Sequence, residues 1–359
     1  MEYLISFGVV FFVFNVIMGF GAILTWMERK QSALMQDRIG ANRADILGFR
    51  VLGLFHILAD SIKMFTKQDF IPPEGNRVLH TVAPMVALLF ALLAFAVIPF
   101  GGIYEFGEYT VSLQILNLNI GILYVFAMMS MGIYGFVLAG WASANNYALL
   151  GGIRASAQMI SYEITMGATI IGILMIYGTL ELQEMVIAQG QLLLGWIPAW
   201  GILYQPLGCA LFMTAAMAET KRVPFDVPEG ESEIIGYFVE YSGMKFGMFF
   251  MTDFIETVLA SALTVTLFFG GWQVPFLYAD GFHFPWGGEL ALPVIAVMLL
   301  QAGAFIVKVF LFCFFFLLVR WTLPRFRWDQ LMQLGWTLML PLSVLNIVVT
   351  GLIVLLVNG

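Results

Sequence analysis

The sequence predicts an all-α polytopic membrane protein with eight transmembrane helices, an amphipathic helix on the cytoplasmic side and both termini on the outer side. Of the 359 residues, 61% are hydrophobic and 11% are charged, whereas soluble domains are about 45–50% apolar and about 25% charged. The apolar residues form long unbroken runs, unlike the alternating segments of about ten residues in a transmembrane β-barrel. A soluble enzyme, a nucleic-acid-binding protein and a disordered chain are therefore excluded.

Eight apolar runs are long enough to cross the hydrocarbon core, which requires about 17–25 residues. They are Leu4–Met27, Val78–Phe100, Leu116–Trp141, Met159–Tyr177, Trp200–Ala218, Phe246–Phe269, Ala291–Val319 and Leu331–Val357. The first run has no basic segment before it and no small-residue cleavage site at a suitable distance, so we interpret it as a retained helix and not a signal peptide. We expect residues 1–359 to form a single integral membrane domain.

The basic residues predict how the chain is oriented in the membrane. The loops after spans one, three, five and seven, counted with their edges, hold fifteen of the 16 Lys and Arg residues, and the remaining one, Lys308, lies within span seven. Because basic loops stay in the cytoplasm, these four loops are expected to be cytoplasmic and both termini to lie outside.

Cysteine and histidine are too few and too scattered for a bound redox centre. Cys209 and Cys313 both lie within apolar runs, and His56, His80 and His283 lie outside the centres of these runs. An iron–sulfur site needs more cysteines in another arrangement, and a haem in the membrane is usually held by paired histidines. If the protein takes part in redox chemistry, its partners or a diffusible molecule must carry the electrons.

The first cytoplasmic segment, residues 28–77, is far longer than a connector and contains an amphipathic stretch, Ile46–Gln68. Spacings of four, three and four residues place four polar side chains on one helical face, namely His56, Asp60, Lys63 and Lys67. This stretch is either a surface helix in the membrane interface, with its charges in water, or a helix whose polar face lines a cavity.

The third cytoplasmic loop, residues 219–245, carries six acidic residues and three basic ones. Pro224 and Pro228 prevent a continuous helix, so the chain must fold back near the membrane surface. Three glutamates alternate at positions 229, 231 and 233, and crowded carboxylates raise one another's pKa. The loop is either an ordinary solvated acidic loop or a group of carboxylates that titrates near neutral pH and passes protons.

Acidic residues also occur inside two predicted spans. Asp253 and Glu256 lie three residues apart in span six, on one helical face, and Glu163 lies near the start of span four. With Glu219 they could form a chain of carboxylates that leads into the bilayer, and acids within a membrane indicate a proton relay. Alternatively, Glu163 reaches the interface.

The last cytoplasmic loop, residues 320–330, combines basic and aromatic side chains. Such a loop is either an anchor at the membrane interface or a docking site for an acidic soluble partner.

Five sequence motifs, spread over most of the chain, can be compared with known families. They are Gln36–Asn42, Gly140–Asn146, Arg154–Glu163, Glu219–Lys245 and Arg320–Gln330. In their order and in their predicted side of the membrane, they resemble the H subunit of proton-translocating NADH:quinone oxidoreductase, respiratory complex I.

The resemblance implies roles for individual residues but no catalytic residue, because the electron donor would be an iron–sulfur cluster of a partner. The quinone-binding chamber would be lined or bordered by Arg38, Asp60, Lys63, Arg222, Phe225, Glu229, Glu231 and Glu233. The proton path would comprise Glu163, Glu219, Glu240 and Asp253. Arg320 and Arg325 would help to hold neighbouring soluble subunits.

The resemblance also implies the surroundings of the chain. Quinone, either ubiquinone or menaquinone, would be the substrate, and this chain would hold no metal, flavin or haem. FMN and the iron–sulfur clusters would belong to peripheral-arm subunits, and antiporter-like subunits would lie beside the chain in the bilayer. No nucleic acid would be bound. We expect a multi-pass protein of the bacterial inner membrane with periplasmic termini.

Several positions depart from the family pattern. Ala41 replaces a common Pro, Asp45 a common Gly, His56-Ile57 a frequent Gln-Pro, and Asp253 a Glu. Two alternative functions stay open: a homologous subunit of a membrane-bound hydrogenase or ferredoxin-linked complex, and a secondary transporter that works alone. A transporter would favour inverted repeats, and no convincing internal repeat is visible.

Overall fold

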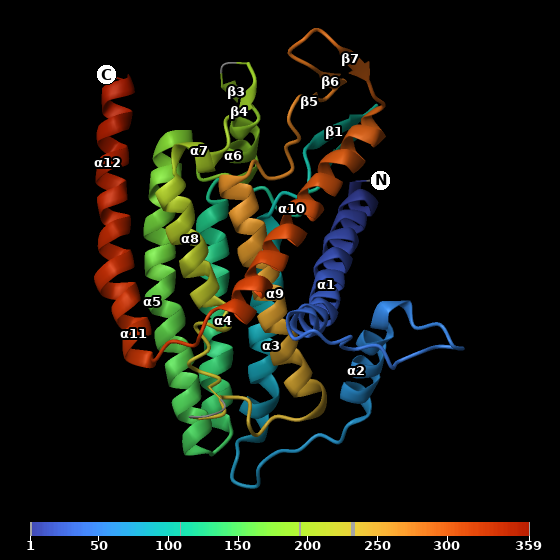
Figure 1. The fold of residues 1–359 in the computed structure, drawn as a ribbon, viewed down its shortest axis with the longest axis vertical. Coiled ribbons are helices and arrows are strands. Elements are labelled where there is room, and N and C mark those ends of the chain that lie inside the picture. The colour runs from blue at the N-terminus through green and yellow to red at the C-terminus, as the bar shows by residue number, and fades with distance from the viewer. Residues whose placement is uncertain (1, 108, 194, 231–233, 359) are drawn as a thin grey trace.

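Long apolar helices run side by side along the longest axis of the molecule in the computed structural model (Figure 1), which describes residues 2–107, 109–193, 195–230 and 234–358. The α-helices are α1 (Glu2–Met35), α2 (Phe55–Thr66), α3 (Arg77–Leu93), α4 (Gly121–Ala142), α5 (Asn146–Tyr177), α6 (Leu182–Gln189), α7 (Gly201–Tyr204), α8 (Pro206–Glu219), α9 (Gly243–Phe268), α10 (Val294–Thr322), α11 (Trp328–Gln333) and α12 (Leu340–Asn358). Short 3₁₀-helices are η1 (Val51–Gly53) and η2 (Ala94–Val97), and η3 (Leu334–Met339) is a π-helix that joins α11 to α12.

Seven helices in the described residues are long and apolar enough to cross a membrane, and Pro206–Glu219 is a shorter apolar helix. The predicted all-α polytopic membrane fold is thereby confirmed. The predicted fifth span, Trp200–Ala218, corresponds to α7 and α8, which are separated at Gln205. The break has a local cause, since Pro206 lacks an N–H donor and restricts the residue before it to non-helical conformations.

Helix α9 lies at the centre of the bundle. In an apolar stretch of 18 residues of this helix, 83% of the residues are buried. Helices α1, α3, α8 and α10 pack against α9. A helix that is enclosed on all sides can carry ionisable side chains without exposing them to lipid. Asp253 and Glu256 are on this helix.

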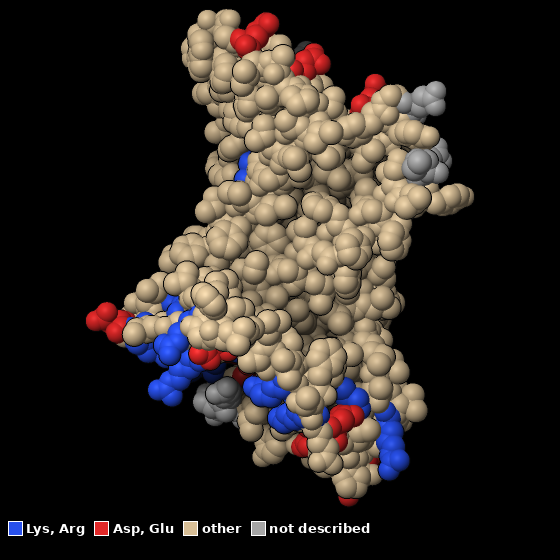
Figure 2. All heavy atoms as spheres, turned by 90° about the vertical axis from the view of Figure 1, so that its right-hand side faces the viewer, with Lys and Arg blue, Asp and Glu red and all other residues tan. Residues whose placement is uncertain are grey.

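The two ends of the bundle differ in structure and charge. The strands form small antiparallel sheets at the upper end of Figure 1, with β1 (Ile103–Phe106) paired to β2 (Tyr109–Ser112), β3 (Leu192–Leu193) to β4 (Ile197–Pro198), and β6 (Gly281–His283) between β5 (Leu277–Tyr278) and β7 (Glu289–Ala291). Lys and Arg side chains gather at the opposite end (Figure 2), hereafter the basic end. The side of the membrane that this end faces stays a prediction.

Two helices differ clearly in extent from the ranges predicted from the sequence. The fourth span was predicted to begin at Met159, but α5 begins at Asn146, where the Asn145 side chain accepts a hydrogen bond from the Tyr147 N–H at 2.9 Å. Residues 146–158, which include Arg154 and are less apolar than the run from Met159, continue this helix, and the apolar run alone does not detect them. Glu163 therefore lies in the middle of α5 and not in its first turn.

The amphipathic helix was predicted over Ile46–Gln68, but α2 covers only Phe55–Thr66. Residues before it adopt left-handed conformations, including Leu52 at φ 54° and Gly53 at φ 86°. A Cβ atom on Gly53 would lie 2.0 Å from the carbonyl oxygen of Ala41. This close approach of two backbone segments requires glycine and ends the helical pattern.

Candidate functional site

The segment after α8 folds back against the bundle at the basic end. The side-chain amide of Gln158 in α5 donates hydrogen bonds to the carbonyl oxygens of Ala218 and Phe225, both at 2.8 Å. Phe225 is buried and stacks on Phe326 of the loop between α10 and α11, with ring centroids 5.5 Å apart. These contacts confirm that the chain turns back here, as the two prolines predicted, and they fix the charged residues that follow α8.

Lys221 is at the centre of a buried charged cluster. Its side chain is 0% exposed, and its Nζ lies 3.0 Å from Oε2 of Glu256 and 3.3 Å from Oδ1 of Asp253. The ammonium also lies over the ring of Phe136, 3.5 Å from its centroid. Burial disfavours the charged amine, but the two carboxylates outweigh this effect and raise the pKa of Lys221.

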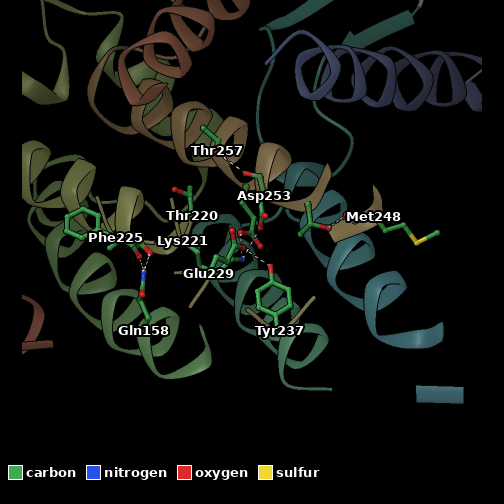
Figure 3. Close-up of polar contacts among 12 residues, drawn as sticks. Gln158, Thr220, Lys221, Phe225, Glu229, Tyr237, Met248, Asp253 and Thr257 are labelled. Carbon is green, nitrogen blue, oxygen red and sulfur yellow. Dashed lines mark hydrogen bonds and ion pairs between the residues drawn. The ribbon is translucent and has the colours of Figure 1, made fainter. Parts of the chain in front are cut away.

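Glu229 joins the same cluster from the loop. The hydroxyl of Tyr237 donates a hydrogen bond to its Oε1 at 3.1 Å, and Figure 3 shows both side chains pointing toward Lys221 and Asp253. Loss of hydration, followed by the charges of Asp253 and Asp226, raises the pKa of Glu229 well above its ordinary value. Glu231 and Glu233, which were predicted to have this effect, lie outside the described residues.

Glu28 links three parts of the chain beside this cluster. Its Oε2 lies 2.9 Å from NH1 of Arg222, and its Oε1 lies 2.6 Å from NH1 of Arg320. The Arg222 guanidinium also covers the ring of Phe254 in α9 at 3.9 Å. Glu28 was not among the predicted site residues, although it is the first charged residue after the first apolar run.

Arg325 forms a second ion pair with the folded-back segment. Its NH2 lies 2.8 Å from Oδ2 of Asp226. Burial raises the pKa of Asp226 to about 6, although the positive charges of Arg325 and Arg320 oppose this shift. The loop 320–330 is thus held to the segment after α8 by an ion pair and by the stacking of Phe326 on Phe225.

Two further acids continue from the cluster into the bundle. Glu219 at the end of α8 is 2% exposed, and neither carboxylate oxygen has a hydrogen-bond partner among the described residues. It lines a cavity of about 10 Å³ together with Glu256 and Met159. On α5, Glu163 accepts a hydrogen bond from the hydroxyl of Ser130. Acids of α5, α8 and α9 therefore meet inside the bundle.

The remaining predicted chamber residues lie near α1 and α2. Asp60 forms an ion pair with Arg29 at 2.6 Å and lies 3.8 Å from the exposed Lys63. Arg38 is exposed and donates a hydrogen bond to the side chain of Gln36 at 2.6 Å. A hollow of about 260 Å³ brings part of this region next to the charged cluster, and its lining residues are Glu28, Arg29, Ser32, Arg38, Gly40, Ala41 and Trp321.

Glu240 has different neighbours from the other predicted proton-path residues. Its Oε1 accepts a hydrogen bond from the Asn145 side chain at 2.9 Å, and its carbonyl oxygen lies 3.2 Å from Nε2 of His80. It lines a separate open hollow of about 470 Å³ with residues of the turn between α4 and α5. The structure thus brings Glu163, Glu219 and Asp253 together and gives Glu240 other contacts.

Comparison with known proteins identifies the family. The sequence profile of the NADH dehydrogenase family matches residues 8–351. An H subunit of NADH-quinone oxidoreductase from Cytophaga hutchinsonii is 44% identical over 96% of this chain and 95% of its own length. The H subunits of the same enzyme from Thermomicrobium roseum and Bdellovibrio bacteriovorus are each 42% identical, over 98% and 92% of this chain and 96% and 91% of their own lengths. The chain belongs to the family of NADH-quinone oxidoreductase H subunits, membrane subunits of that enzyme.

Proposed function

We propose that the basic end of this protein forms much of the chamber in which a quinone, ubiquinone or menaquinone, is reduced. The hollow between Glu28, Arg38 and Trp321 supports this proposal, because it lies between α1 and the end of α10 and beside the ion pairs of Arg222 and Arg320. The apolar tail of the quinone would stay among the helices while its polar headgroup reaches these charges. Ligand sites commonly combine an apolar wall with a few convergent polar groups.

The chain supplies binding and charge, whereas its partners supply the electrons. We infer that an iron–sulfur cluster of a peripheral-arm subunit faces the chamber and that FMN lies farther along the same route. Reduction of a quinone to a quinol takes up two electrons and two protons. In surroundings of low dielectric constant, the accompanying change of charge acts strongly on nearby ionisable groups.

The second part of the proposal is a carboxylate path that couples this change of charge to proton translocation. It would run from Glu229 through Asp253 to Glu219 and Glu163, toward antiporter-like membrane subunits. The observation that carries it is the gathering of buried ionisable groups from α5, α8, α9 and the folded-back segment. Ionisable groups inside a membrane are costly, and they commonly serve proton transfer.

The same arrangement supports a docking role for the loop 320–330. Arg320 is anchored by Glu28, whereas Arg325 pairs with Asp226 and still exposes 36% of its side chain. Its free donors would bind acidic groups of a peripheral-arm subunit. The basic end would then face the cytoplasm of a bacterium, with both termini in the periplasm.

Mass spectrometry of the complex isolated with this chain tests the proposal. The membranes are solubilised in a mild detergent, and the tagged chain is recovered at low salt. We expect an FMN-containing NADH-oxidising subunit, iron–sulfur subunits and antiporter-like subunits. Recovery with a nickel–iron hydrogenase, or of the chain alone and intact, would contradict the proposal.

A further inference from the structure

A buried ion pair between Lys221 and Glu256 lies inside the proposed carboxylate path. Lys221 was not predicted from the sequence to belong to that path. Glu256 was grouped with the other acids by its position in span six, but it was not among the path residues that the resemblance implied. The Lys221 side chain is 0% exposed and that of Glu256 only 10% exposed. The pair joins α9 to the segment after α8. A lysine without access to water is stable as an ammonium only when carboxylates surround it.

Four acids that interact with Lys221 fall into two groups, those paired with its ammonium and those that are not. Asp253 and Glu256 lie within 3.3 Å of its ammonium. Glu219 and Glu229 form no ion pair with it: both oxygens of Glu219 lack a hydrogen-bond partner among the described residues, and Glu229 accepts from the hydroxyl of Tyr237. Each unpaired acid lies beside a paired one. Glu219 lines the same cavity as Glu256, and Glu229 interacts electrostatically with Asp253.

We propose that Lys221 is a positioning residue of this path: its ammonium holds Asp253 and Glu256 as its ion-pair partners, so that the transferable proton resides on Glu219 or Glu229 on either side of them. The inference rests on the carboxylate path proposed above. Several ionised carboxylates cannot share one enclosed site at no cost, because like charges disfavour one another. One ammonium offsets part of this repulsion, and the position of that ammonium selects which acids ionise.

The ionisable groups that face one another in this cluster come from α5, α8, α9 and the folded-back segment. They are Glu163 on α5, Glu219 on α8, Asp253 and Glu256 on α9, and Lys221, Arg222, Asp226, Glu229 and Tyr237 on the folded-back segment. Two of them are already engaged elsewhere, since Arg222 pairs with Glu28 and Asp226 with Arg325. Of the three cations on the folded-back segment and its described neighbours named above, Lys221 is the one paired with Asp253 and Glu256.

A small cavity between Glu219 and Glu256 lies where an acid without an ion pair meets an acid paired with Lys221. Its volume is about 10 Å³, close to the lower limit for one water molecule. The two carboxylates in its wall are the only ionisable residues among its described lining residues. A water molecule held there would connect Glu219, which would carry the proton, to Glu256, the acid paired with Lys221.

The pH profile of quinone reduction by the whole complex, in inside-out membrane vesicles, tests the role of Lys221. Lys221→Met removes a positive charge, which makes the path acids harder to ionise. The limb of the pH profile that follows their ionisation should therefore move to higher pH by about one unit. Glu256→Gln removes a negative charge and should move the same limb down by about the same amount. The double variant Lys221→Met/Glu256→Gln changes no net charge, and its profile should return close to that of the wild type.

A purely structural role predicts another pattern. Both single variants would lower the amount of assembled complex or its rate at all pH values and leave the profile in place, and this result would overturn the proposal. Displacement of both profiles in one direction would do the same. If the Lys221→Met chain is not incorporated into the complex, Glu256→Gln decides: a downward displacement supports the role of Lys221, and an unmoved profile overturns it.

Glu219→Gln in the same vesicles separates this inference from the function on which it rests. If Glu219→Gln retains full quinone turnover and proton pumping, the carboxylate path itself is wrong. If Glu219→Gln impairs both activities while the Lys221 and Glu256 variants keep the wild-type profile, the path stands and only the role of Lys221 is overturned.

Discussion

Glu28 and Arg222 form an ion pair across 194 residues of sequence, with 2.9 Å between Oε2 and NH1. The other oxygen of Glu28 binds Arg320. One carboxylate therefore connects the end of α1, the segment after α8 and the end of α10, at the wall of the hollow proposed to receive the quinone headgroup. Loss of its charge would leave two arginines without their partner in a partly buried place.

Replacement of Glu28 by Gln should weaken quinone turnover more than assembly. The Gln amide has one acceptor oxygen, so one arginine would keep a weaker hydrogen bond to a neutral group and the other would face an NH2 donor. The two guanidinium groups would also repel each other once the carboxylate charge is gone. We expect a fall of about tenfold in kcat/KM for quinone, which corresponds to about 1.4 kcal/mol. The measurement is NADH:quinone reductase activity normalised to assembled complex.

Glu289→Gln provides the matched control, because Glu289 lies on β7 at the opposite end and 77% of its side chain is exposed. This control should keep the wild-type activity. Equal activities of the Glu28→Gln and Glu289→Gln complexes would contradict the proposed role of Glu28.

Replacement of Glu219 or Glu163 by Gln should uncouple or slow the enzyme. Gln has nearly the shape of Glu but cannot carry the proton of a relay. We expect proton pumping in vesicles to fall about tenfold or more, while NADH oxidation by a water-soluble acceptor stays intact. The control is Glu105→Gln, at an exposed residue of β1. Full pumping by both path variants would disprove their role.

Asp226 should make the stability of the complex depend on pH between about 4 and 6. Its pKa rises from an ordinary 3.8 to about 6 because of burial, so the folded state favours the protonated acid. The resulting stabilisation is complete below 3.8 and is lost as pH rises through about 6, and its size is about 3 kcal/mol. Because Asn cannot ionise, Asp226→Asn should gain Tm relative to wild type over this range.

The measurement is the difference in Tm between the two complexes in detergent from pH 4 to pH 7. The difference should grow up to about pH 6 and then level off. A difference that is constant with pH would show that Asp226 keeps an ordinary pKa.

Two glycines on one face of α4 should respond differently to alanine. A Cβ on Gly135 would lie 2.7 Å from the backbone nitrogen of Ala87 in α3, so the two helices would have to separate. A Cβ on Gly132 would meet nothing closer than 3.9 Å. Gly135→Ala should cost about 1–3 kcal/mol, whereas Gly132→Ala should be neutral or slightly stabilising.

Thermal unfolding in detergent, with loss of the assembled complex as the readout, measures this pair. Both variants carry the same substitution one helical turn apart, so a difference between them reports the contact with α3. Equal Tm values would contradict the close packing of α3 on α4.

The sequence was sufficient for the fold class because membrane helices are specified by long apolar runs that a local pattern detects. The sequence predicted helix boundaries less well where a helix continues past its most apolar run, as at Asn146, or where two backbone segments approach closely, as at Gly53. Neither the first turns of α5 nor the contact of Gly53 with Ala41 leaves a clear signal in hydropathy.

The sequence predicted only part of the candidate site, because contacts between residues far apart in the sequence leave no local pattern. The Asp253–Glu256 spacing indicated that both acids share a helical face, and the structure places both beside Lys221. The partner itself could not be deduced, because Lys221 lies 35 residues from Glu256 and reaches it only after the chain folds back. Glu28 was missed for the same reason, since its arginines come from distant parts of the chain.

The proposed quinone chamber is tested most directly by photoaffinity labelling of the intact complex with a photoreactive quinone. Peptides from this chain that carry the label are identified by mass spectrometry, with and without excess unlabelled quinone. We expect label on residues 28–41 and 219–230, near the hollow at the basic end, and its loss when unlabelled quinone competes. Label confined to the strands at the opposite end, or label in this chain that excess quinone does not displace, would contradict a quinone chamber at the basic end.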